Sequence, residues 1–253
     1  MTKIVAVTNQ KGGVGKTTTA VNLSACIANL GHRVLLVDCD PQGNASSGLG
    51  ISRRKDALSI YDLLLEDRDA GSIIKTTSVP LLNILPSNIQ LAGAEVELAD
   101  IHQREYRLRK ALKDVRQYYQ YIILDCPPSL GLLTINALTA ANSVLIPLQC
   151  EYYALEGLSM LVDTVQLVKR RLNPALVIEG IVFTMFDGRT NLSIEVVDEV
   201  KKHFSKEVYR TIIPRNIRLS EAPSHGIPII QYDPKSRGAE VYSELALEVL
   251  ERG

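Results

Sequence analysis

Eight consecutive residues near the N-terminus combine glycines, lysines and hydroxyl side chains at a spacing that suits phosphate groups. The segment consists of Lys11, Gly12, Gly13, Val14, Gly15, Lys16, Thr17 and Thr18. Successive backbone N–H groups of a glycine-rich turn point at phosphate oxygens, and a following helix adds its positive N-terminal end. In this pattern Lys16 would reach the β- and γ-phosphates of a nucleotide, and the Thr17 hydroxyl would ligate Mg²⁺. The sequence therefore predicts a nucleotide-binding loop.

The loop departs from the ordinary pattern G-x-x-x-x-G-K-[ST] at one position. That pattern requires glycine where this chain has Gln10, and the chain offers Lys11 beside Gly12 instead. A lysine at the start of the loop would lie on the solvent side of the nucleotide. There it could neutralise transition-state charge in a neighbouring subunit, as an arginine finger does. We therefore expect Lys11 to act across a subunit interface.

Three aspartates follow apolar runs that end at the same edge of a predicted sheet. The run Ile122-Ile123-Leu124 ends in Asp125, the form expected of the carboxylate that holds the water shell of Mg²⁺. A second run, residues 34–37, ends in Asp38 and is followed two residues later by Asp40. Asp40 could orient the attacking water, and Asp38 could support Mg²⁺ or its waters. Together with the loop, these positions predict one shared site.

The elements that must position these residues alternate along the chain. Apolar runs that predict buried strands cover residues 3–8, 33–38, 81–85, 121–125, 143–148 and 177–184. Helical patterns separate most of them, including one at residues 17–30 and one at residues 239–251. Residues 51–80 are the least regular part and are expected to form an insertion or an edge. The alternation predicts an α/β fold with a mainly parallel twisted sheet, helices on both faces, and a ligand at the carboxyl ends of the strands.

Length and composition set broad limits on the protein. The chain has 253 residues, which suits a single domain over residues 1–253. Its formal net charge is zero, so nucleic acid or anionic lipid would have to bind to a local patch. The four cysteines are widely spaced and predict small core side chains in a reducing cytosol. Neither a signal peptide nor an apolar run of membrane-spanning length is found, so we expect a cytoplasmic protein.

Four segments together resemble the ParA-type, Soj-like chromosome-partitioning ATPases. They read KGGVGKTT, DCDPQGN, ILDCPPSLGLLTINAL and IPRNIRLSEAPSHG, and the resemblance covers nearly the whole chain. The first segment is shared by a wider class with a deviant Walker A loop, which includes MinD-type ATPases, nitrogenase iron proteins and arsenical-pump ATPases. The last segment, residues 213–226, best distinguishes the ParA-type ATPases from the rest of this class. The resemblance implies a P-loop NTPase fold with ATP and Mg²⁺ as cofactors.

The same resemblance implies how the site works. ATP would join two subunits in a nucleotide sandwich, with Lys11 of each reaching the phosphates of the other, and hydrolysis would reset the dimer. Catalysis would need mainly positioning and charge neutralisation, from Lys16, Lys11 and the Asp40-oriented water. The adenine pocket of the family maps onto Pro214 and Asn216, with Met185 as a weaker candidate.

The family also binds DNA without sequence preference, as ATP-bound dimers. The matching basic residues would be Arg189 and Arg218, with Lys201, Lys202 and Lys206 as additions. Dimerisation doubles a modest patch, and phosphate contacts make affinity fall steeply with salt. The resemblance further implies nucleoid association and stimulation of the ATPase by a ParB-type centromere-binding protein.

Three alternatives remain open. A MinD-like membrane-associated ATPase would need a C-terminal amphipathic helix with a basic polar face, whereas this tail is rich in glutamate. An electron-transfer protein of the nitrogenase iron-protein type would need paired cysteines for a cluster. A metabolic ligase or kinase that uses the same loop would need a small-molecule pocket, which the sequence does not locate.

Overall fold

The core of the molecule is one twisted sheet in which the spatial order of the strands differs from their order in the sequence. The computed structural model describes residues 2–52, 54, 57–66 and 68–252. Within them eight strands pair in the order β3-β4-β2-β5-β1-β6-β7-β8, and every pairing is parallel except β3 with β4. The strands are β1 Lys3–Val7, β2 Val34–Asp38, β3 Lys75–Thr76, β4 Leu82–Leu85, β5 Tyr121–Asp125, β6 Ser143–Gln149, β7 Val177–Phe186 and β8 Val208–Pro214. The expected parallel α/β fold is confirmed.

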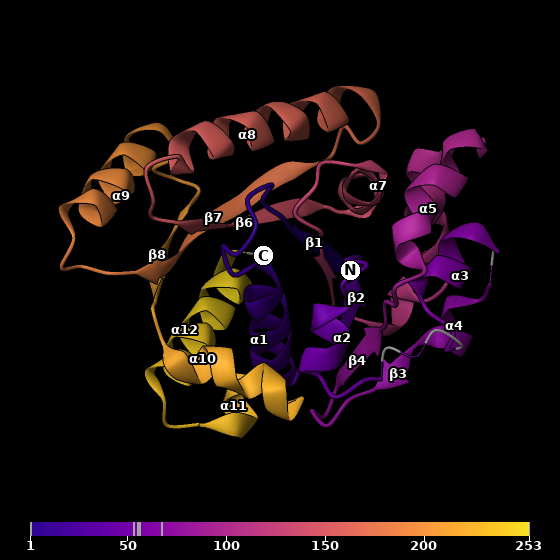
Figure 1. The fold of residues 1–253 in the computed structure, drawn as a ribbon, viewed down its shortest axis with the longest axis horizontal. Coiled ribbons are helices and arrows are strands. Elements are labelled where there is room, and N and C mark those ends of the chain that lie inside the picture. Colours follow the sequence, from indigo (N-terminus) through magenta and orange to yellow (C-terminus); the bar gives the residue numbers. More distant parts are fainter. Residues whose placement is uncertain (1, 53, 55–56, 67, 253) are drawn as a thin grey trace.

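Helices pack on both faces of the sheet and bury its apolar side chains in two layers (Figure 1). One layer contains α1 Lys16–Asn29, α2 Asn44–Gly48, α11 Ile229–Tyr232 and α12 Arg237–Arg252, with α10 Ile217–Glu221 beside them. The other contains α3 Ile60–Leu65, α4 Ala70–Ile73, α5 Leu91–Glu97, α6 Arg107–Ala111, α7 Leu132–Ala140, α8 Ala154–Arg171 and α9 Asn191–His203. Short 3₁₀ turns cover Leu98–Asp100, Arg104–Tyr106, Arg116–Tyr118 and Ala222–His225. Burial on both faces explains why the strands read as continuous apolar runs.

Each apolar run expected to form a strand matches one to within two residues at either end, and two strands were not expected. β3 is only two residues long, lies at the edge of the sheet, and falls in the irregular region 51–80. β8 was missed because Arg210 and Thr211 interrupt its apolar pattern. As the last strand of the sheet, β8 can expose Arg210 to solvent. The predicted helices at residues 17–30 and 239–251 are present as α1 and α12.

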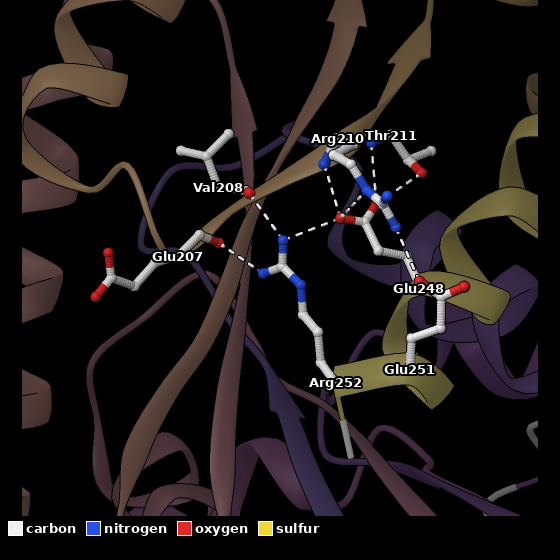
Figure 2. Close-up of polar contacts among 7 residues, drawn as sticks. All are labelled: Glu207, Val208, Arg210, Thr211, Glu248, Glu251 and Arg252. Atoms are coloured by element: carbon white, nitrogen blue, oxygen red, sulfur yellow. Dashed lines mark hydrogen bonds and ion pairs between the residues drawn. The ribbon is translucent and has the colours of Figure 1, made fainter.

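The C-terminal helix is fastened to β8 by a buried carboxylate (Figure 2). Glu248 accepts hydrogen bonds from the backbone N of Arg210 at 2.8 Å and of Thr211 at 3.1 Å, and from the Thr211 hydroxyl at 3.0 Å. Arg252 adds a bond from Nη2 to Glu248 at 2.9 Å. Burial opposes ionisation, but these donors and the Arg252 charge lower the pKa of Glu248. Much of the glutamate-rich tail is thus part of the fold.

Candidate nucleotide-binding site

The carboxyl ends of three neighbouring strands bring the predicted site together. β1 runs into the glycine-rich loop, and β2 and β5 lie side by side with Asp38 in register with Asp125. Parallel strands in register place their ends at one edge of the sheet, where ligands of this fold class bind. The loop and the carboxylates, far apart in sequence, therefore share one place in the fold.

The loop adopts backbone conformations that only glycine takes readily. Gly13 has φ 76° and Gly15 has φ 85°, both in the left-handed region. Gly15 precedes the first residue of α1, so its turn leads directly into the helix N-terminus. Thr184, at the end of β7, donates its hydroxyl to the Val14 carbonyl at 2.8 Å. Val14 itself is buried, and through its carbonyl the loop contacts β7.

Both lysines of the loop have partners inside the chain. Lys16 Nζ donates to the Lys11 carbonyl at 2.7 Å, and the Lys16 side chain is almost completely buried. Burial lowers the pKa of Lys16, while the nearby Asp125 acts in the opposite direction. Lys11 forms an ion pair with Glu151, in the turn between β6 and α8. Lys11 therefore points toward its own subunit, while Lys16 points along the loop.

Asp125 is a buried carboxylate without a protein partner. Neither of its oxygens has a hydrogen-bond partner in the part of the chain that the structure describes. Burial and the charge of Asp38 raise its pKa well above the ordinary value, although Thr17 and Lys16 act against this. Buried polar groups are nearly always paired, so an orphaned carboxylate indicates a place for a ligand. The donor set of Asp125 and the Thr17 hydroxyl fits a hard cation such as Mg²⁺.

Asp38 and Asp40 differ from Asp125 because protein groups already engage them. Asp38 accepts hydrogen bonds from the backbone N and the hydroxyl of Ser46 at 2.8 and 2.7 Å, and from the backbone N of Asp40 at 3.2 Å. Burial still raises the pKa of Asp38 to about 6. Asp40 accepts from the backbone N of Gln42 at 2.8 Å and lines the adjoining cavity. Asp38 thus fixes the backbone that presents Asp40.

A cavity of about 740 Å³ connects the loop to the base-binding candidates. Its lining includes Met185, Pro214 and Asn216, all three expected from the family resemblance. Asn216 caps α10: its Oδ1 accepts from the backbone N of Arg218 at 2.9 Å. The amide oxygen is thus held in place, which leaves the NH₂ group as a donor for a base edge. The lining also includes Gly12, Gly13, Gly15, Lys16, Thr17, Thr18 and Asp40.

Met185 holds an unusual backbone conformation at the rim of this cavity. Its φ is 49°, in the left-handed region that non-glycine residues seldom adopt. It directly follows Thr184, whose hydroxyl holds the loop, and directly precedes the last residue of β7. Strained residues of this kind cluster at functional sites. The end of β7 is therefore shaped by the site as well as by the sheet.

The two arginines expected to bind DNA follow the ends of β7 and β8. Arg189 is largely exposed and contacts Asp187 from Nη2 at 2.6 Å. This pairing lowers the pKa of Asp187 to about 2. Arg218 contacts Glu221 from Nη1 at 2.9 Å. Both guanidinium groups have intramolecular carboxylate partners and remain accessible from solvent.

The additional lysines are arranged less favourably. Lys201 and Lys202 lie in the last turn of α9, where Lys202 Nζ contacts Glu199 at 2.8 Å, and Lys206 follows that helix. Arg215, which the sequence did not single out, lines the cavity, and its charge contributes to the low pKa of Asp187. Arg215 belongs to the segment at residues 213–226 that carries the family resemblance, but nothing in that segment alone marks it as a neighbour of Asp187. The two residues lie close because β7 and β8 are adjacent in the sheet.

Two alternatives gain no support from these features. All four cysteines are buried and free, which does not suit a cluster held between subunits. The apolar face of α12 packs inside the protein through Val241, Leu245 and Val249. Among the described helices, none is both long and apolar enough to cross a bilayer.

The sheet order, the glycine-rich loop and the carboxylates at the strand ends define a P-loop nucleotide-binding protein of the deviant Walker A class. A family model described as an AAA domain matches residues 2–178. The chain is 64% identical over 253 residues to the sporulation initiation inhibitor protein Soj of Bacillus subtilis (strain 168), with 100% of both chains covered. The chain belongs to the Soj/ParA family of chromosome-partitioning proteins.

One further relative supports the family, and one solved structure supports the fold. The chain is 56% identical over 250 residues to the chromosome partitioning protein ParA of Myxococcus xanthus (strain DK1622), covering 99% of this chain and 88% of that protein. A solved structure of cobyrinic acid a,c-diamide synthase from Mycobacterium smegmatis with bound ADP and magnesium superposes with a TM-score of 0.87. It is 39% identical, and the match covers 99% of this chain and 95% of that one.

Proposed function

We propose that this protein is an ATP-hydrolysing molecular switch for chromosome or plasmid segregation. The observation that carries the proposal is the cavity of about 740 Å³ that joins the phosphate loop to Pro214 and Asn216. It has room for a nucleotide and offers phosphate donors at one end and a base-reading amide at the other. The crystallised relative with ADP and magnesium supports the same ligands here.

The residues of the site take complementary roles in this proposal. The N–H groups of the loop and Lys16 would bind the β- and γ-phosphates, and the Thr17 hydroxyl and Asp125 would hold Mg²⁺. When bound, Mg²⁺ neutralises charge on the phosphate oxygens. Asp38 would support the water shell of the ion, and it fixes the backbone N of Asp40. Asp40 would then orient the attacking water in line with the γ-phosphate.

Dimer formation is the proposed output of ATP binding. Lys11 lies at the start of the loop, and its side chain is 39% exposed, so it can reach outward. In a sandwich of two ATP-bound subunits it would neutralise phosphate charge in the partner. Hydrolysis would remove the γ-phosphate and with it the reason for the two subunits to stay together.

DNA binding is proposed to follow from dimer formation. Arg218 lies between Ile217 and Leu219, which line the nucleotide cavity, and Arg189 is an exposed residue that follows β7. A dimer would present both arginines twice. One subunit offers too few contacts, because phosphate binding depends on the number of counterions released. A ParB-type centromere-binding protein is the proposed stimulator of hydrolysis. The apolar face of α12 is buried in the core, which supports the proposal that the protein associates with the nucleoid and not with a membrane.

The test is DNA retention by wild type and Arg189→Glu with ATP, ADP and no nucleotide across a salt series. Wild type should bind only with ATP, and Arg189→Glu should lose DNA while it still dimerises. The matched control is Arg170→Glu, the same charge change in the last turn of α8, which should bind like wild type. Equal retention by Arg189→Glu and wild type would remove Arg189 from the DNA surface. Stimulation of the ATPase by a metabolite but not by DNA would favour a metabolic ligase. Co-sedimentation of the protein with anionic vesicles would favour a MinD-like protein.

A further inference from the structure

We infer that Glu151 is a positioning residue that holds Lys11 against its own subunit and so sets how readily two ATP-bound subunits join. The inference rests on the role proposed above for Lys11 in the dimer. It adds a residue that belongs to none of the four motifs, because Glu151 lies in the turn between β6 and α8.

The entry of the phosphate loop is docked on the segment that carries Glu151. Asn9 donates from Nδ2 to the Pro147 carbonyl at 2.8 Å, inside β6. Gln10 donates from Nε2 to the Gly157 carbonyl at 3.0 Å, in the first turns of α8. These two bonds flank the β6–α8 turn on both sides. The start of the loop and this turn therefore form one unit, although their residues are far apart in sequence.

The third contact of this unit is the ion pair between Lys11 and Glu151. Unlike the two bonds beside it, it joins two side chains that are 39% and 44% exposed. Pairs this exposed are weak, because water and salt screen them. It is therefore the contact of the three that a stronger anion can replace. The phosphates of a partner subunit's ATP are such an anion.

The backbone of Lys11 links this pair to the nucleotide of the same subunit. Lys16 Nζ donates to the Lys11 carbonyl at 2.7 Å. A lysine ammonium has three donors, so Lys16 can keep this bond and still contact the β- and γ-phosphates. The backbone of residue 11 is therefore held in place when the subunit binds its own ATP, and the Lys11 side chain is the part that the phosphates of the partner's ATP can draw away from Glu151.

The surface beside the pair is suited to a second copy of the chain. Tyr152 and Tyr153 follow Glu151 directly and are 76% and 66% exposed. Their rings meet edge to face, with centroids 5.0 Å apart. Exposed aromatic residues are typical of surfaces that a protein partner covers. Release of Lys11 from Glu151 would therefore take place next to the surface that the partner contacts.

The test compares wild type with Glu151→Gln, which keeps the shape of the side chain and removes its charge. Dimer dissociation constants would be measured by sedimentation with AMPPNP and Mg²⁺ at low and high salt. Each dimer breaks two such pairs, and an exposed pair contributes roughly threefold in binding, so the Glu151→Gln dimer should be about tenfold tighter. High salt should shrink this difference, because it weakens the ion pair in wild type.

Three controls separate positioning from a structural effect. Glu156→Gln makes the same charge change in the first turn of α8 and should leave the dimer constant as in wild type. Glu151→Asp keeps the carboxylate and should stay closer to wild type than Glu151→Gln does. Affinity of the monomer for ATP should be equal in all variants, since Glu151 does not line the cavity.

Two outcomes would overturn the inference. A Glu151→Gln dimer that is weaker than wild type would mean that Glu151 orients Lys11 toward the partner. An unchanged dimer constant would mean that the pair is irrelevant. Failure of wild type to dimerise at any AMPPNP concentration would instead contradict the proposed function, so the two failures can be told apart.

Discussion

Replacement of Asp125 by asparagine should make the nucleotide-free protein more stable and the nucleotide-bound protein less so. Asp125 is fully buried, and its oxygens have no partner among the described residues. An unpaired buried polar group costs about 1–3 kcal/mol, and more when it is ionised. Asparagine has the same shape and would leave its polar atoms equally unpaired, but it carries no charge, so it removes the additional cost of the ionisable group. We therefore expect Asp125→Asn to gain about 2 kcal/mol without ligand, or about 4–8 °C in Tm for a chain of this size.

Mg²⁺ and ATP should reverse this order. A ligand at a hundred times its dissociation constant stabilises a protein by about 2.7 kcal/mol. Wild type should gain that amount, and Asp125→Asn should gain much less because it lacks the carboxylate proposed to hold the ion. Thermal unfolding followed by circular dichroism, with and without Mg²⁺ and ATP, measures both effects. The two melting curves should therefore exchange places when the ligand is added.

The pH dependence of the stability difference between Asp125→Asn and wild type independently checks the direction of the effect. The pKa of Asp125 is raised in the folded protein, so below its unfolded value of about 3.9 the carboxyl is neutral in both states. The advantage of Asp125→Asn should be absent there and should grow as pH rises toward the folded pKa. Asp38→Asn is the comparison: Asp38 is equally buried and in register with Asp125, but it accepts three hydrogen bonds. Asp38→Asn should gain less stability than Asp125→Asn, because an asparagine amide cannot accept all three hydrogen bonds.

A clear loss of ligand-free stability in Asp125→Asn would refute this reasoning. So would a full response of Asp125→Asn to Mg²⁺ and ATP.

Three further predictions follow from single contacts. Gly12→Val should fold and bind ATP, because a Cβ at Gly12 meets nothing within 4 Å inside the subunit. It should fail to dimerise, because the added side chain would fill space at the proposed interface; light scattering with ATP checks this, and a valine variant that dimerises contradicts it. Asp40→Ala should bind ATP and hydrolyse it at least 100-fold more slowly, a typical loss for a general base; normal phosphate release would remove Asp40 from its role. Glu248→Gln should lose about 3 kcal/mol in urea unfolding, because buried donors lose their carboxylate, whereas the exposed Glu251→Gln should lose under about 1; equal losses would contradict the buried role.

Sequence patterns predicted the parts of the molecule whose physical signal is local. The glycine-rich loop is followed at once by its helix, and α1 begins at Lys16, next to the residue expected. Buried parallel strands need apolar side chains on both faces, which made β1, β2 and β5 visible. β8 was invisible for the opposite reason: its place at the sheet edge permits Arg210 within the strand.

The site was predictable in its residues and less so in their contacts. Nothing local to Asp38 or Asp125 indicates that Ser46 satisfies one and leaves the other unpaired. That difference arises because α2 packs against the end of β2. Thr184 and Glu151 were missed because each acts on the loop from more than a hundred residues away. Such contacts depend on the order of the strands in the sheet.

The strand order also bears on how the protein emerges during synthesis. β1 is made first and lies in the middle of the sheet, yet both of its neighbours, β5 and β6, are made much later. At about 5–20 residues per second, the ribosome needs on the order of ten seconds to supply β5. During that interval the phosphate loop has no sheet to hold it and no Pro147, Gly157 or Thr184 to dock on. The ability to bind nucleotide should therefore appear late in translation, as a mark of a nearly finished chain.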